Sequence, residues 1–129
     1  MEILSIDDYS VSYDGSKSAV DAVSLSVSQG DILSIVGESG SGKSTLLHGI
    51  LGLLPRGAST RGSMKLFGRE VTRMAERERR TLCGSSVSMI FQDTGRYMNP
   101  IARIGAQYDE FLRIHGMIDK RQRRDLQRE

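Results

Sequence analysis

The sequence predicts an α/β fold, and three features of the chain indicate it. Two β-rich segments lie near the N-terminus, a Gly- and Ser-rich loop separates a short apolar run from a helical stripe, and amphipathic helical patterns follow. The chain has 129 residues, 38% hydrophobic and 26% charged, which is typical of a soluble globular protein rather than a disordered one. This length is enough for one small domain.

The N-terminal segments predict an antiparallel pair of strands. Residues 3–13 are apolar and β-rich, and residues 20–27 alternate apolar side chains with serines, which is typical of a strand with one solvated face. Asp14-Gly15-Ser16 is a turn signal between them. Residues 64–66 indicate a further half-exposed strand.

A buried strand, a loop and a helix are expected in the middle of the chain. Residues 32–36 form an apolar run interrupted by one serine, which suggests a strand covered on both faces. After the loop 37–42, residues 43–54 place apolar side chains three and four positions apart, as on one face of a helix. Residues 74–82 predict a charged amphipathic helix, and residues 87–91 a second buried strand.

The C-terminal part predicts an apolar stripe without a partner. After Pro100, residues 101–115 place apolar side chains and His115 on one helical face. A second helix opens at Asp119, with Gln122 placed to complete a capping box. The sequence ends inside this charged pattern.

Composition and charge argue against several classes of protein. The uncharged stretch at the apolar peak, residues 44–55, is far shorter than the roughly 20 residues of a membrane-spanning helix. The N-terminus is acidic where a signal peptide would be basic, and the single cysteine, Cys83, cannot form an internal disulfide. The formal net charge is only +2. We therefore expect a cytoplasmic protein.

The strongest chemical signal is a phosphate-binding loop. Residues 37–44 read GESGSGKS, which matches G-x-x-x-x-G-K-[ST] between an expected strand and an expected helix. The glycines let backbone N–H groups face phosphate oxygens, and the helix dipole adds partial positive charge. In this pattern Lys43 reaches the β and γ phosphates, and the Ser44 hydroxyl is a ligand of Mg²⁺. A dinucleotide fingerprint is excluded because Thr45 stands where a third glycine is needed.

Kinases, GTPases and transport ATPases share this loop, so the reaction depends on a second element. The candidate is the apolar run 87–91, followed by Gln92 and Asp93. Either Asp93 holds the metal of a small P-loop kinase, or Gln92 is the functional residue at the strand end. Gln92 occupies a position that the metal-binding pattern fills with an apolar residue, which tells against the kinase.

Together, the segments GESGSGKST, MIFQD and Asn99-Pro100 resemble the ATP-binding subunits of ABC transporters, and more narrowly the importer group for dipeptides, oligopeptides and nickel. The likeness runs along the whole chain. It implies a P-loop NTPase core with an N-terminal antiparallel β subdomain and the start of a helical subdomain, incomplete. Residues 1–100 would be the N-terminal part of the ATP-binding domain, including the Q-loop, and residues 101–129 the beginning of the helical subdomain.

The resemblance also implies site residues and cofactors. Tyr13 would stack on adenine, and Gln92 would contact Mg²⁺ and the attacking water. Lys43 and Gln92 would be the catalytic residues, Ser44 and Gln92 the Mg²⁺ ligands, and ATP and Mg²⁺ the cofactors. The nucleotide-binding residues would be Tyr13, Gly37, Glu38, Ser39, Gly40, Ser41, Gly42, Lys43, Ser44 and Thr45.

The implied function is ATP hydrolysis that energises import of a small solute, a di- or oligopeptide or nickel. The implied partners are transmembrane permease subunits, a second ATP-binding subunit and, indirectly, an extracytoplasmic solute-binding protein. The implied location is the cytoplasmic face of the cell membrane, as a peripheral protein.

Two departures from the family pattern bear on these expectations. Residues 94–98 lack the proline and the short polar run that usually follow Gln-Asp, which affects the coupling contact with the permease more than the nucleotide site. This sequence lacks three further motifs of the family, which are the LSGGQ signature, the strand ending in Asp-Glu and the switch histidine. His48 and His115 do not take the place of the switch histidine. We therefore expect an N-terminal piece that binds nucleotide but hydrolyses it negligibly alone.

An Arg-rich segment from Arg113 onward suggests a further alternative, a non-transport ABC ATPase that acts on nucleic acid. Its basic residues are interleaved with Asp119, Asp125 and Glu129. A solvated helix face explains this pattern better. Nucleic acid is therefore not an expected partner.

Overall fold

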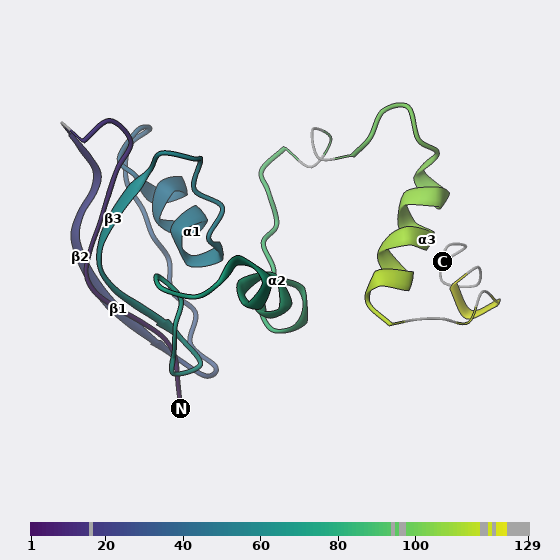
Figure 1. Ribbon diagram of the computed structural model, residues 1–129, viewed down its shortest axis with the longest axis horizontal. Coiled ribbons are helices and arrows are strands. Elements are labelled where there is room, and N and C mark those ends of the chain that lie inside the picture. Colours follow the sequence, from purple (N-terminus) through teal and green to yellow (C-terminus); the bar gives the residue numbers. More distant parts are fainter. Residues whose placement is uncertain (16, 94, 96–97, 117–118, 120, 124–129) are drawn as a thin grey trace. The chain divides into compact units, whose positions relative to one another are not determined.

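The computed structural model describes residues 1–15, 17–93, 95, 98–116, 119 and 121–123, and the chain divides into two compact units, Met1–Thr81 and Leu82–Glu129. The first unit contains β1 (Glu2–Ser12), β2 (Ser18–Ser28), α1 (Lys43–Leu51), β3 (Ser59–Leu66) and β4 (Arg69–Glu70) (Figure 1). Helix α2 (Glu76–Ser85) runs across the boundary, and α3 (Ile104–Ile114) belongs to the second unit. The predicted division of the chain at residue 100 stays a prediction.

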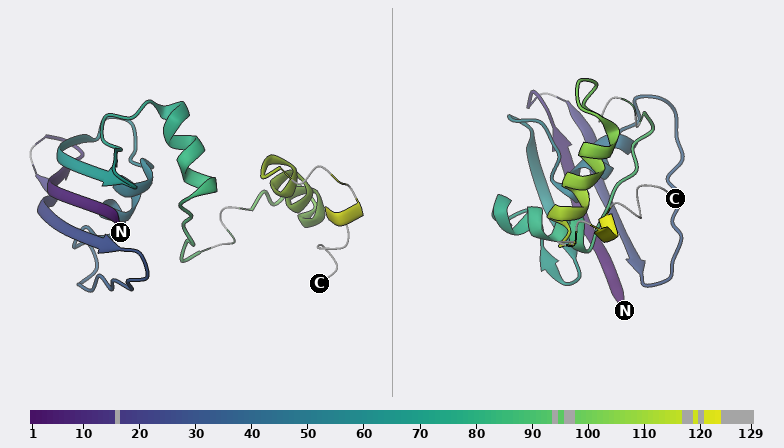
Figure 2. Two further views of the ribbon diagram at one scale, coloured as in Figure 1. Left: turned by 90° about the horizontal axis from the view of Figure 1, so that it is seen from below. Right: turned by 90° about the vertical axis from the view of Figure 1, so that its right-hand side faces the viewer.

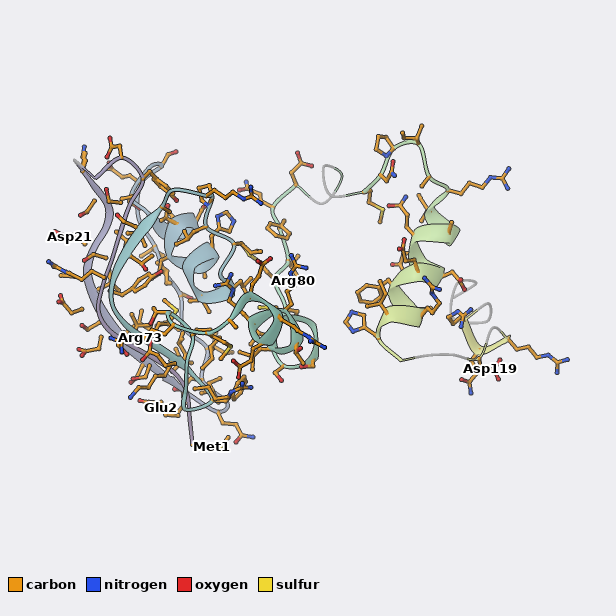
Figure 3. All side chains as sticks on the ribbon, viewed as in Figure 1. Met1, Glu2, Asp21, Arg73, Arg80 and Asp119 are labelled. Atoms are coloured by element: carbon orange, nitrogen blue, oxygen red, sulfur yellow. The ribbon has the colours of Figure 1, made fainter. Side chains whose placement is uncertain are left out.

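The first unit is built on an antiparallel sheet with strand order β2-β1-β3-β4 (Figures 1 and 2). Helix α1 packs on one face of this sheet, against β1 and β2. On β2 the Val23, Leu25 and Val27 side chains are half-buried and the serines are exposed, as the alternation predicts. Asp21 on the same strand is exposed and points away from α1 (Figure 3). The predicted antiparallel pair is therefore confirmed. Of the predicted turn, Ser16 lies outside the described residues.

Two irregularities interrupt the pairing of β1 with β2. Asp8 and Ala22 both have a positive φ of 48°, at register shifts between the two strands. Their N–H groups donate to hydroxyl oxygens, that of Asp8 to Ser24 Oγ (3.0 Å) and that of Ala22 to Ser10 Oγ (2.9 Å). Serines thus satisfy the backbone donors that the bulges remove from the ladder. Gly62 on β3 faces one bulge, where a Cβ would lie 2.3 Å from the Asp8 carbonyl oxygen.

The core of the first unit lies between the sheet and α1 (Figure 3). Tyr9 is its largest side chain and is only 2% exposed. It lies against Gly49 of α1, where a Cβ would be 2.7 Å from Tyr9 Oη. Burial raises the pKa of the Tyr9 hydroxyl, and the neighbouring Tyr13 raises it further. Among the residues that the structure describes, the buried apolar ones are Ile6, Tyr9, Val11, Val20, Leu46, Leu51, Met64, Leu66, Val71 and Leu82.

Glu70 closes the hairpin between β3 and β4. Its carboxylate accepts hydrogen bonds from Ser63 Oγ (2.6 Å), from the Met64 N–H (3.0 Å) and from the Thr72 hydroxyl. Burial raises the pKa of Glu70, but these hydrogen bonds outweigh burial and lower it to about 2. The charged carboxylate is therefore the form that the fold favours.

Two predicted strands are wrong. Residues 32–36 form no strand, and Ile32 and Val36 are 96% and 89% exposed. In residues 87–91 the only β contact is a single bridge between Cys83 and Val87. Among the described residues no strand pairs with either run, and an apolar segment without lateral hydrogen bonds does not become a strand. The apolar pattern of these two runs predicted burial, but a local pattern carries no information about whether a neighbouring strand is present to pair with them.

The predicted helices form with shifted ends. Helix α1 ends at Leu51 rather than at residue 54, because Gly52 adopts a left-handed φ of 65°. The N–H groups of Gly52 and Leu53 then donate to the carbonyl oxygens of Gly49 and His48, which is a Schellman cap. Helix α2 begins two residues after the predicted start at residue 74, and α3 begins three residues after residue 101.

In the second unit, polar side chains hold α3 to its flanking segments. Gln107 donates to the Asn99 and Ala102 carbonyl oxygens and accepts from the Asn99 N–H. Arg123 Nε lies 2.7 Å from Asp109 Oδ1, which ties the helical turn at 121–123 to α3.

Asp119 caps this turn, since its side chain accepts from the Arg121 N–H. The rest of the second predicted helix, at 120 and 124–129, lies outside the described residues. In the described part of the chain, no helix has the length and apolar character needed to cross a membrane.

Candidate nucleotide-binding site

The phosphate loop leads directly into α1. Gly42 is the N-cap of the helix and has a φ of 91°, a conformation that favours glycine. A Cβ at this position would lie 2.2 Å from the Ala19 carbonyl oxygen, so the loop is seated against the start of β2. Gly42 offers no side chain to cap the helix, so the first-turn N–H groups remain available to an anion.

Lys43 places its ammonium group inside the loop. Nζ donates to the carbonyl oxygens of Gly37 (2.7 Å) and Glu38 (2.6 Å) and to Ser41 Oγ (3.1 Å). These three bonds use the three donors of the ammonium. A phosphate oxygen can replace these neutral acceptors and pair the ammonium with a negative charge. The predicted loop residues therefore converge around the cation that the motif requires.

Tyr13 is joined to the same helix. It follows the last residue of β1 and is 44% exposed. Its hydroxyl donates to Thr45 Oγ1 over 2.9 Å. The structure thus brings together the two ends of the predicted site, the aromatic residue and the first turn of α1. No pattern in the sequence predicts this contact.

A cavity of about 480 Å³ joins Tyr13 to the phosphate loop. Its volume falls in the usual range for small-molecule sites. Asp14, Lys17, Ser18 and Ala19 were not predicted as site residues. Their only sequence signal is that they follow Tyr13 within six residues. The lining residues are Tyr13, Asp14, Lys17, Ser18, Ala19, Gly40 and Ser41.

A second cavity, of about 580 Å³, lies within the second unit. Its walls are mostly apolar, and include Met89, Phe91 and Phe111. It offers no array of backbone donors at a helix start, so the cavity beside the phosphate loop is the better nucleotide site.

Gln92 and Asp93 belong to the second unit, where both are exposed. Their predicted roles at the nucleotide, as a water-positioning residue and as a kinase metal ligand, stay predictions. Of the unusual segment that follows, Thr94, Arg96 and Tyr97 lie outside the described residues.

Ser44 has the chemistry that a Mg²⁺ ligand requires. It lies in the first turn of α1, is exposed, and carries a hydroxyl oxygen. Mg²⁺ takes oxygen ligands and usually keeps water and substrate phosphates among them. In the described ranges, no three His, Cys, Asp or Glu side chains gather as a metal site. The Ser44 hydroxyl fits a metal carried by the phosphates of a nucleotide.

These features define a class of protein. A Gly-rich loop at the start of α1, the Lys43 ammonium inside it and the adjoining cavity are the parts of a P-loop nucleotide-binding protein. The sequence profile of the family described as ABC transporter matches residues 20–128. The chain belongs to this family, and membership of it implies that the chain binds ATP. The predicted fold class and the resemblance are therefore confirmed.

Curated relatives are similar to almost the whole chain. The dipeptide transport ATP-binding protein DppD of Escherichia coli (strain K12) is 40% identical over 129 residues, which cover 96% of this chain and 39% of the relative. The oligopeptide transport ATP-binding protein OppD of Salmonella typhimurium is 39% identical over 121 residues, 92% of this chain and 36% of the relative. The peptidoglycan transport ATP-binding protein YejF of Agrobacterium fabrum is 39% identical over 121 residues, which cover 90% of this chain and 22% of the relative. The chain spans at most about two fifths of these relatives.

Proposed function

We propose that this chain is the nucleotide-binding part of a subunit that hydrolyses ATP to power import through an ABC transporter. Membership of the family supports ATP binding. The observation that carries the proposal is the Lys43 ammonium inside the loop, next to the cavity bordered by Tyr13. Relatives named for dipeptide, oligopeptide and peptidoglycan transport favour a peptide-containing solute over nickel.

Each predicted residue of the first unit contributes a separate contact to the nucleotide. The N–H groups of the loop and of the first turn of α1 bind phosphate oxygens. Lys43 exchanges its acceptors within the loop for oxygens of the β and γ phosphates. Tyr13 stacks on adenine. Ser44 directs its hydroxyl to Mg²⁺, which when bound neutralises charge on the phosphates.

In the whole protein, Gln92 orients the attacking water and contacts Mg²⁺. Hydrolysis of ATP requires groups that position the attacking water and stabilise the charge on the transferred phosphoryl group, and it needs more of them than the described residues supply. We therefore propose that the whole protein hydrolyses ATP as a dimer and that the 129-residue chain does so negligibly.

The proposed partners are transmembrane permease subunits and a second ATP-binding subunit, with a solute-binding protein as an indirect partner. The proposed location is the cytoplasmic face of the cell membrane. Names of the relatives as transport ATP-binding proteins support this assembly.

The test uses the whole subunit with its permease in lipid vesicles. Peptide uptake and ATP hydrolysis are measured with the parent subunit, Lys43→Ala and the matched surface variant Lys65→Ala. We expect both activities to be lost in Lys43→Ala and kept in Lys65→Ala, because Lys65 is exposed on β3. Phosphate transfer to a metabolite that depends on Asp93 would instead establish the kinase.

A further inference from the structure

The side-chain bond between Tyr13 and Thr45 joins the end of β1 to the first turn of α1. Tyr13 Oη donates to Thr45 Oγ1 over 2.9 Å. Tyr13 stands just beyond the strand ladder, since β1 ends at Ser12. Tyr13 therefore lies outside the ladder, and its hydroxyl bond ties the ring to the phosphate-loop helix.

We propose that Thr45 is a positioning residue for Tyr13, whose hydroxyl holds the tyrosine ring at the wall of the nucleotide cavity before the nucleotide arrives. This inference rests on the proposed function. It assigns two separate tasks to one residue. The Thr45 backbone N–H belongs to the phosphate-binding turn of α1, whereas its hydroxyl serves the base end of the site.

The packing around this bond makes it specific. Tyr9 and Tyr13 are four residues apart at the end of β1, and Thr45 and Gly49 are four residues apart on α1. Tyr9 lies against Gly49, and Tyr13 bonds to Thr45. Buried Tyr9 thus fixes the distance between strand and helix at which the hydroxyl of exposed Tyr13 reaches its acceptor.

The bond matters for affinity because an aromatic ring that is already in place loses less freedom on binding. A neutral hydrogen bond at a part-exposed site corresponds to about two- to tenfold in a binding constant. Loss of the bond should therefore weaken ATP binding by this factor. It should not weaken binding of a ligand that has phosphates but no base.

The experiment measures dissociation constants of the 129-residue chain for MgATP and for magnesium tripolyphosphate. Thr45→Val removes the hydroxyl and keeps the branched shape, and Tyr13→Phe removes the donor and keeps the ring. Each should weaken MgATP binding by about two- to tenfold, and the double variant should be no weaker than either. Tripolyphosphate affinity should not change, Thr45→Ser should restore MgATP affinity, and Tyr108→Phe is the matched control in the second unit.

Two results would overturn the inference and leave the proposed function standing. One is an equal loss of MgATP and tripolyphosphate affinity in Thr45→Val, which would place the hydroxyl on the phosphates. The other is MgATP binding that neither variant changes. If the parent chain binds no MgATP, or Lys43→Ala binds it equally well, the proposed function and the inference fall together. Matching thermal unfolding curves for the variants exclude misfolding as the cause.

Discussion

Substitution of Gly49 by alanine sets two opposing effects against each other inside α1. Alanine in a helix interior is favoured over glycine by about 1 kcal/mol. The added Cβ, however, would lie 2.7 Å from Tyr9 Oη, 3.1 Å from Tyr9 Cε1 and 3.3 Å from Tyr9 Cζ. Tyr9 is 2% exposed, so its ring is enclosed by the core and cannot turn out into solvent without opening it.

The crowding should win. Overpacking a filled core costs about 1–3 kcal/mol, so Gly49→Ala should destabilise the first unit by about 1 kcal/mol after the gain in helix propensity. In a Tyr9→Phe background the shortest of the three contacts is gone, and the same alanine should be neutral or stabilising. The measurement is the midpoint of denaturant unfolding for the four proteins of this double-mutant cycle. A parent chain made more stable by Gly49→Ala would refute the close packing of α1 on β1.

Three further predictions test other parts of the structure. Gly42→Ala should lower the free energy of unfolding by more than about 1–2 kcal/mol and abolish MgATP binding. A Cβ there would lie 2.2 Å from the Ala19 carbonyl oxygen, and the left-handed φ adds strain. Denaturant unfolding measures the loss of stability, and titration calorimetry measures the loss of binding. The pKa of Glu70 in the folded state is about 2, below the ordinary value of 4.5. The stabilising contribution of its carboxylate should therefore be complete above pH 4.5 and lost as the pH falls toward 2. Glu70→Gln should flatten this part of a plot of unfolding free energy against pH. Asp109→Asn should loosen the 121–123 turn, because it removes a charged partner of buried Arg123. Hydrogen exchange of the amides at 121–123 should become faster. An exchange rate equal to that of the parent chain would contradict this prediction.

Local patterns were sufficient to predict most elements of the first unit. The alternation of valine, leucine and serine on β2 and the apolar stripe of α1 are signals that neighbouring residues carry. The phosphate loop could also be predicted from the sequence, because its glycines, Lys43 and Ser44 form one contiguous motif.

Features that depend on distant contacts could not be predicted. The runs 32–36 and 87–91 are apolar enough for buried strands, yet a strand exists only beside another strand. The bond between Tyr13 and Thr45 depends on how α1 packs on β1, and Gly49 allows that packing without any mark in the local pattern. The lining of the cavity by Asp14 and Lys17 follows from the same packing.

The claim that Lys43 binds the phosphates of ATP has a direct test. MgATP binding to the 129-residue chain is measured by titration calorimetry for the parent, Lys43→Ala and Lys65→Ala. Loss of a charge-assisted bond to phosphate should weaken binding about tenfold or more in Lys43→Ala, with Lys65→Ala unchanged. Equal affinity of the parent and Lys43→Ala would contradict the assignment of the loop as the nucleotide site.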